Sequence, residues 1–325
     1  KSGKMVEVLY PTNHYINHNR QLIASQKIAE EFAGRTVVEG EAITKKCNVY
    51  LPAGYDEADV NKKYNVIYFL HGVGGNHFEW MLDKNEQGVP VICSILDHLT
   101  ENGETEPMIV VFPEGRSAIN WENCEFDPES TSMLGFYYFD YELRFDLIPF
   151  IESQFHTYAD INQTSASAKE YNRLHRAIAG LSMGGMQSLN LTFGGYRCDS
   201  AFLCGAISPW NNGLVETVRT PGMEDLFSFV GAFSNAPTTS KGEILGEGIR
   251  TSGYTMSVLH IICGDSDGIA YEMGYQKAIN GLMKEAGDAV KLYSPAIIKG
   301  GKHDFGVWNY GAYQFLKQIF RNEEK

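Results

Sequence analysis

A Gly-x-Ser-x-Gly segment near the middle of the chain, residues 180–184, constrains the fold more than any other feature. Residues 176–179 before it predict a short buried strand, and residues 186–191 after it predict the first turns of a helix. Glycines on both sides of Ser182 allow a sharp turn that holds the serine exposed in a strained conformation. The following helix would direct its first amides at the serine oxygen. The segment therefore predicts a nucleophilic serine between a strand and a helix.

A nucleophilic serine needs a general base, and two histidines follow Ser182 in the chain. His260 lies in the apolar run 257–262 and is interpreted as a residue of the sheet core. His303 lies in the glycine-rich segment 299–305, directly after the strand-like residues 296–298. A loop at a strand end can present an imidazole to the serine, so His303 is the predicted base.

The base in turn needs a carboxylate to fix its tautomer, and this acid is expected between the serine and the histidine. The segment after the strand-like run 261–263 offers Asp265 and Asp267. Asp265 follows the strand at once and can instead hydrogen-bond the loop backbone. Asp267 stands farther out and is preferred because it can reach a loop histidine, with Asp265 as the alternative.

A second glycine-rich turn, residues 71–75, follows the β-branched and aromatic run 66–70. Such a turn after an early strand allows a backbone N–H to approach a substrate carbonyl closely. The predicted oxyanion-hole donors are the amides of Val73 and of Met183, the residue after the serine. An ordinary glycine turn is the alternative interpretation, and His71 is expected to pack and hydrogen-bond beneath the loop.

The chain has 325 residues, 43% of them hydrophobic, which is enough to bury the core of one large domain. Strand-like runs alternate with amphipathic helical stretches such as residues 274–284, and this alternation predicts an α/β fold with a mostly parallel sheet covered on both faces. Residues 1–34 are interpreted as an N-terminal extension packed on the core, and residues 35–325 as a single catalytic domain.

Aromatic residues near the predicted site are candidates for a flat apolar slot that holds substrate. These candidates are Trp121 in the long connection 120–136, Trp210, and Phe305 beside His303. The alternative for each of them is that its ring only covers the core.

A formal net charge of −13 with no basic stripe disfavours nucleic acid and anionic membranes as partners. No apolar run has the length of a membrane-spanning helix. The six cysteines are scattered without metal-type pairing, so they are interpreted as free thiols, with a single disulfide as the alternative. We predict neither a metal site nor a cofactor.

Four segments, residues 71–75, 179–185, 263–267 and 301–308, together resemble the feruloyl esterases of carbohydrate esterase family one. The resemblance runs in order from about Thr44 to the C-terminal helix. It implies an α/β-hydrolase fold and agrees with Asp267 as the catalytic acid. It also implies a serine esterase that removes hydroxycinnamoyl groups from plant cell-wall xylan through an acyl-enzyme.

Two other functions stay open beside that expectation. An acetyl-xylan or short-chain acyl esterase would use the same residues, with feruloylated or acetylated arabinoxylan as the polymeric partner in either case. A polysaccharide-binding protein on a catalytically retired hydrolase fold belongs to a different class. The chain begins at Lys1 without a methionine or a signal-peptide core, and we expect a secreted protein whose signal peptide has been removed.

Overall fold

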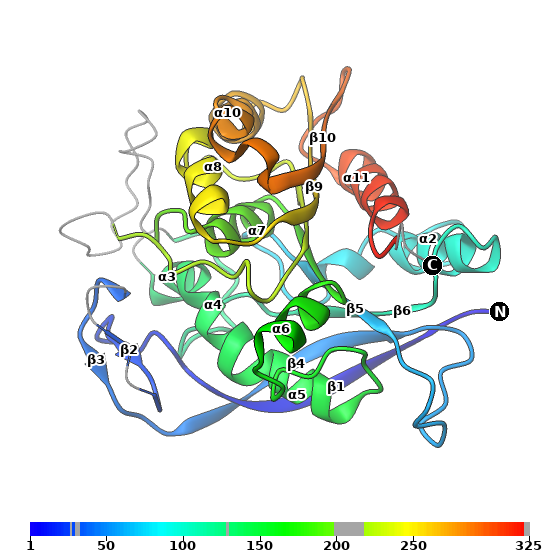
Figure 1. Ribbon diagram of the computed structural model, residues 1–325, viewed down its shortest axis with the longest axis horizontal. Helices are drawn as coiled ribbons and strands as arrows, with labels where there is room; N and C mark the ends of the chain where they lie inside the picture. Colours follow the sequence, from blue (N-terminus) through cyan, green and yellow to red (C-terminus); the bar gives the residue numbers. More distant parts are fainter. Residues whose placement is uncertain (27, 30–32, 128–129, 198–217, 322–325) are drawn as a thin grey trace.

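The computed structural model describes residues 1–26, 28–29, 33–127, 130–197 and 218–321. Within them, one sheet of eight strands organises the molecule (Figure 1), in the spatial order β1-β4-β6-β5-β7-β8-β9-β10. In chain order these strands are β1 Lys4–Asn13, β4 Ala42–Leu51, β5 Asn65–Leu70, β6 Met108–Pro113, β7 Arg176–Leu181, β8 Phe229–Phe233, β9 Met256–Gly264 and β10 Val290–Ile298. The short strands β2 (Leu22–Ile23) and β3 (Val37–Val38) pair separately.

Six neighbouring strands, from β6 to β10 in the sheet order, run parallel. β4 pairs antiparallel with β6, and β1 pairs antiparallel with β4. The central strands β5, β6, β7 and β8 are buried at every position, as expected for parallel strands covered on both faces. The predicted α/β architecture with a mostly parallel sheet is therefore confirmed.

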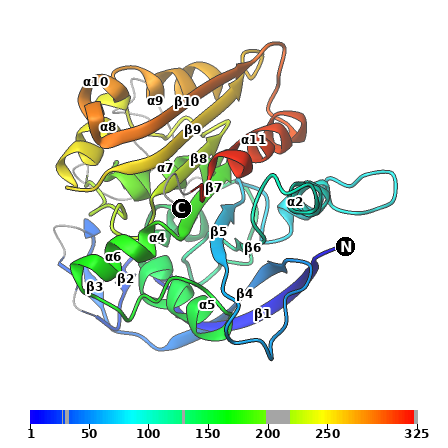
Figure 2. The ribbon, with the colours of Figure 1, turned by 45° about the vertical axis from the view of Figure 1, so that its right-hand side comes forward.

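Helices cover both faces of the sheet, as Figure 2 shows. α2 (Val91–Glu101) and α11 (Phe305–Gln318) pack on one face against the side chains of Ile67 and Phe69. The alternate residues of β5, including Tyr68, point to the opposite face and its larger group of helices. That group comprises α4 (Phe139–Glu142), η3 (Leu143–Leu147), α5 (Ile148–Gln154), α7 (Met183–Phe193), α8 (Gly242–Thr251), α9 (Lys277–Ile279) and α10 (Leu282–Ala286).

The remaining helical segments are short. They are η1 (Glu79–Met81), α3 (Thr131–Gly135), η2 (Phe136–Tyr138), α6 (Ala166–Arg173), η4 (Tyr271–Gln276) and η5 (Gly287–Ala289).

The amphipathic helical stretch 274–284 is helical in the structure, but in separate pieces. Three short helical pieces, η4, α9 and α10, occupy this part of the chain. The break lies at Asn280, whose backbone is extended, and at Gly281, whose φ of 78° is left-handed. A glycine adopts that angle without steric cost, so the chain turns there although its apolar period continues.

The N-terminal residues enter the main sheet at its edge. β1 pairs with β4 over its full length, from Lys4 opposite Leu51 to Asn13 opposite Ala42. Residues before and after residue 34 thus contribute strands to the same sheet. The division of the chain at residue 34 stays a prediction. Among the described cysteines, Cys47, Cys93, Cys124 and Cys263 are free thiols.

Candidate active site

Ser182 occupies the turn between β7 and α7. Its backbone has φ 52° and ψ −114°, outside the regions that residues other than glycine normally adopt. The surrounding structure holds this conformation through three hydrogen bonds: Ser182 N–H donates to the Phe233 carbonyl, and the Ser182 carbonyl accepts from Ala236 and Met186. Such strain concentrates at functional sites and here lifts one side chain above the carboxyl end of the sheet.

Gly180 and Gly184, on either side of Ser182, are required because other backbone segments pass too close for a side chain. A Cβ atom on Gly184 would lie 2.6 Å from the His71 carbonyl oxygen and 2.7 Å from the Leu70 carbonyl oxygen. A Cβ atom on Gly180 would collide with the backbone of Gly184. The start of α7 therefore packs directly on the ends of β5 and β7, which fixes where Ser182 stands.

His303 and Asp267 meet Ser182 from two other strand ends. His303, in the loop between β10 and α11, has its Nε2 atom 3.0 Å from Ser182 Oγ. Its Nδ1 atom lies 2.7 Å from Oδ2 of Asp267, which follows β9. Because the Asp267 carboxylate accepts from Nδ1–H, the Nε2 atom of a neutral imidazole faces the serine as a proton acceptor. The structure thus brings the three predicted residues into one hydrogen-bonded chain.

The Asp267 carboxylate is fully buried but well supplied with donors. Its Oδ1 atom accepts from the backbone N–H groups of Ile269, at 2.9 Å, and Ala270, at 2.8 Å. Burial acts to raise the pKa of Asp267, but the hydrogen bond from His303 and those from the two amides outweigh it and hold the pKa below its usual value. Asp267 is therefore a carboxylate at neutral pH.

Asp265, the alternative acid, and His260, the other histidine after Ser182, make different contacts. Asp265 is exposed, and its Oδ1 atom accepts from the backbone N–H of Gly300 at 2.7 Å, so it ties two loops together. His260 is buried in β9, with Nδ1 2.8 Å from the Ser294 carbonyl oxygen, and burial lowers its pKa to about 4. Its interpretation as a residue of the sheet core agrees with this position.

The predicted oxyanion donors flank the serine. A Cβ atom on Gly72 would lie 3.1 Å from the Ser182 Cβ atom, so the glycine turn runs directly beside the nucleophile. Glu79, which the sequence did not single out, accepts from the Gly72 N–H at 2.8 Å and holds this turn. Among the described residues, the amides of Val73 and Met183 make no hydrogen bond. Both remain available to a ligand at Ser182.

A buried ionic cluster beneath the glycine turn is the main feature that sequence reasoning missed. Lys45, Glu114, Arg116 and Glu142 have side chains that are at most 1% exposed. Lys45 Nζ donates to Glu142 at 2.9 Å and to the carbonyls of Glu114 and Arg116. Arg116 Nη1 donates to the carbonyl of Gly75 at 2.7 Å. The cluster therefore connects the edge of the sheet to the turn beside Ser182.

The two glutamates of this cluster differ in their pKa values. Burial raises the pKa of Glu142 to about 7, although the charge of Lys45 and hydrogen bonds from Lys45 and Tyr10 act to lower it. Burial acts to raise the pKa of Glu114, but the neighbouring His71 ring and the positive charges of Lys45 and Arg116 lower it to about 2. One signal could have revealed the cluster: Lys45 shares a face of its strand with Cys47 and Val49, both buried. A lysine on an apolar face needs a buried partner.

The three aromatic candidates have different surroundings. Phe305 is half-buried at the start of α11 and packs edge-on against Trp80 and Trp308, with Trp308 also edge-on to His303. Trp121 is half-buried, and its ring lies 5.8 Å from Lys45 Nζ. Trp210 lies outside the described residues.

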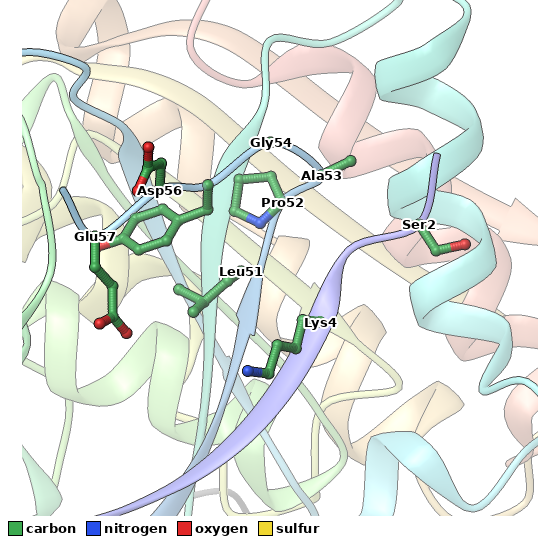
Figure 3. A pocket seen from close by; sticks show the side chains of 9 residues that line it. Ser2, Lys4, Leu51, Pro52, Ala53, Gly54, Asp56 and Glu57 are labelled. Atoms are coloured by element: carbon green, nitrogen blue, oxygen red, sulfur yellow. The ribbon is translucent and has the colours of Figure 1, made fainter. Parts of the chain in front are cut away.

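A surface hollow of about 510 Å³ lies away from this site (Figure 3). Ser2, Lys4 and residues 51–57 line it. Leu51 ends β4, which runs antiparallel to β6, so this hollow lies at the amino ends of the parallel strands and Ser182 at their carboxyl ends.

The described residues contain neither a metal-binding cluster nor a membrane-spanning helix. Within them, no three His, Cys, Asp or Glu side chains gather in a way that could hold a metal ion. Their helices also include none with the length and apolar character needed to cross a membrane.

Comparison with known proteins identifies relatives of the chain. Residues 43–212, more than half of the chain, match the model of the Esterase family, described as "Putative esterase". The chain is 33% identical over 276 residues to "Endo-1,4-beta-xylanase/feruloyl esterase" of Xylanibacter ruminicola, covering 84% of this chain and 29% of that protein. It is 41% identical over 157 residues to "Endo-1,4-beta-xylanase Y" of Acetivibrio thermocellus, covering 47% of this chain and 12% of that protein. The chain therefore spans less than a third of these relatives.

Among solved structures, the chain is similar to a mutant of the feruloyl esterase module from Clostridium thermocellum complexed with sinapinate. The TM-score is 0.62 with 24% identity, and the match covers 100% of this chain and 90% of that one. This likeness confirms the predicted α/β-hydrolase fold. The chain belongs to the Esterase family, and its family and fold are those of carboxylic ester hydrolases.

Proposed function

We propose that the chain is a serine esterase that hydrolyses feruloyl and related hydroxycinnamoyl esters of plant cell-wall xylan. The observation that carries the proposal is the hydrogen-bonded chain Ser182–His303–Asp267 at three strand ends, beside two unbonded amides. The substrate class is supported by the printed names of similar proteins, a xylanase/feruloyl esterase and a feruloyl esterase module. Feruloylated arabinoxylan is the expected polymer, and a substrate of that size places the enzyme outside the cell.

In the proposed reaction, Ser182 Oγ attacks the ester carbonyl carbon while His303 Nε2 takes the hydroxyl proton. The carbonyl oxygen becomes an oxyanion that accepts hydrogen bonds from the amides of Val73 and Met183. The C–O bond to the sugar then breaks, and His303 returns the proton to the leaving alcohol. Water then attacks the acyl-enzyme while His303 takes its proton. The bond to Ser182 Oγ breaks, His303 returns the proton to Oγ, and the free acid leaves.

The strained serine and the buried carboxylate have the roles that this reaction requires. Asp267 stays ionised and stabilises the imidazolium that forms at His303 during each proton transfer. The half-buried rings of Trp121 and Phe305, with Trp210, are the proposed contacts for the hydroxycinnamoyl ring.

The test is product release from natural polymers. Feruloylated arabinoxylan and acetylated xylan are each incubated with the wild-type protein and with Ser182→Ala, and free ferulate and acetate are quantified. The proposal predicts release of ferulate by the wild type and loss of that release in the variant. Release of acetate alone would identify an acetyl-xylan esterase instead. Absence of both products with the wild type would contradict an esterase acting on xylan.

A further inference from the structure

The peptide between Gly72 and Val73 is held from its carbonyl side. His71 Nδ1 lies 2.7 Å from the Gly72 carbonyl oxygen, and the N–H of Gly75 donates to the same oxygen at 3.3 Å. This peptide carries the N–H of Val73, the proposed oxyanion donor. Its orientation therefore decides whether that N–H faces the substrate.

The hydrogen on His71 Nδ1 follows from the partners of the ring. A carbonyl oxygen only accepts, so Nδ1 must carry the hydrogen that joins it to Gly72. On the other side of the ring, the N–H of Gly115 donates to Nε2 at 2.8 Å, and Glu114 Oε1 lies 3.3 Å away. Because Nε2 accepts from Gly115, the ring carries its hydrogen on Nδ1 and donates it to Gly72.

The ring has little freedom to turn. His71 is only 1% exposed, and Phe136 packs edge-on against it with ring centroids 5.7 Å apart. Gly115, which donates to Nε2, accepts through its own carbonyl from Gln187 of α7 at 3.0 Å. His71 is thus fixed between the end of β6 and the helix that begins after Ser182.

A trans peptide directs its C=O and N–H to opposite sides. Because the Gly72 carbonyl points at the His71 ring, the N–H of Val73 points away from it, while Gly72 itself lies against Ser182. We propose that His71 is a positioning residue that orients the Gly72–Val73 peptide so that the Val73 N–H serves the oxyanion. This inference rests on the proposed function for its catalytic consequence.

Two substitutions of His71 test the roles of its two ring nitrogen atoms separately. His71→Asn keeps a donor at the position of Nδ1 and loses the acceptor at Nε2. His71→Gln keeps an acceptor near Nε2 for the Gly115 N–H and loses the donor to Gly72. The measurements are kcat and KM with methyl ferulate, the melting temperature, and a crystal structure of each variant.

The proposal predicts that His71→Gln lowers kcat by about a hundred- to a thousandfold, as loss of one oxyanion donor does, with KM little changed. Its crystal structure should show the Gly72–Val73 peptide rotated. His71→Asn should keep the wild-type peptide orientation and recover most of kcat. Equal losses of kcat in both variants that follow their melting temperatures would mean a packing role only and would overturn the proposal.

The crystal structures also separate this inference from the proposed function. If the wild type hydrolyses no ester, the proposed function has failed, yet the peptide orientation in the two variants still reports on His71. An unrotated peptide in His71→Gln would overturn the positioning role even if the wild type proves to be an esterase.

Discussion

At the scale of single residues, the conformation of Ser182 depends on the absence of side chains around it. Gly184 lets α7 start against the ends of β5 and β7, and no other residue leaves that space empty. The Gly-x-Ser-x-Gly pattern predicted this turn because it is a local requirement of the backbone.

Gly184→Ala should therefore destabilise the protein and reduce its activity. The new Cβ atom would lie 2.6 Å from the His71 carbonyl, and backbone on both sides would have to move. We expect a loss of about 1–3 kcal/mol in the free energy of unfolding, as for overpacked sites. Urea unfolding measures it. Gly268→Ala is the control, since no atom lies within 4 Å of its added Cβ. Equal stability of the two variants would contradict the packing argument.

The two aspartates after β9 allow a test of the proposed acid. Asp267→Asn should lower kcat by about a thousand- to ten-thousandfold, because an amide at this position favours the wrong imidazole tautomer. Asp265→Asn, on the exposed neighbour that bonds Gly300, should keep kcat close to the wild-type value. Steady-state kinetics with methyl ferulate would decide, and the reverse order of effects would assign the acid to Asp265.

At the scale of elements, β4 carries the charge on which the buried cluster depends. Lys45 and Lys46 are neighbours in this strand, but Lys45 faces the core and Lys46 faces solvent. The alternation of a strand thus gives adjacent lysines opposite environments.

Lys45→Met should cost about 3–5 kcal/mol in the free energy of unfolding, because it removes the cation shared by Glu114 and Glu142 and the donor to two buried carbonyl groups. Lys46→Met should stay within about 0.5 kcal/mol of the wild type, as surface substitutions do. Chemical denaturation at neutral pH measures both variants. A stable Lys45→Met protein would show that the cluster contributes nothing net to folding.

Elements were predictable where their signal is local. The runs 66–70 and 176–179 correspond to β5 and β7, and residues 186–191 lie within α7. The helical stretch 274–284 is interrupted because Asn280 is extended and Gly281 left-handed, and apolar periodicity does not report such backbone angles. The ionic cluster joins β4, the segment after β6 and α4, so no local pattern contains it.

At the scale of the whole molecule, stability should depend on one buried carboxyl group that has no ion-pair partner within 4 Å among the described residues. Glu224 is 6% exposed. Burial raises its pKa from 4.5 to about 8, and the adjacent Asp225 charge adds to the shift. The folded protein therefore holds a proton that the unfolded chain releases as pH rises from about 4.5.

Because the folded state binds more protons in this range, the free energy of unfolding should contain a contribution that falls as pH rises from 4.5 to about 8. Glu224→Gln removes the titrating group and should flatten this part of the profile. Urea unfolding at several pH values, with wild type and variant side by side, measures the difference. Identical slopes for the two proteins would mean that Glu224 is not protonated in the folded state.

The sequence predicted the fold class, a mostly parallel sheet covered by helices, but not the order in which all the strands pair. Alternating strands and helices predicted a parallel sheet, but not the pairing of β1 with β4, because these two strands are distant in sequence. The site residues could be proposed because each lies in a loop with its own glycine or aspartate signal. Their assembly depends on where β7, β9 and β10 end in one sheet.

Activation of Ser182 by His303 is tested most directly by active-site labelling. The protein is treated with a fluorophosphonate, and the modified residue is identified by peptide mass spectrometry in the wild type and in His303→Ala. The account predicts one adduct, on Ser182, that forms rapidly in the wild type and far more slowly in the variant. An adduct on another residue, or equal labelling rates for the two proteins, would contradict it.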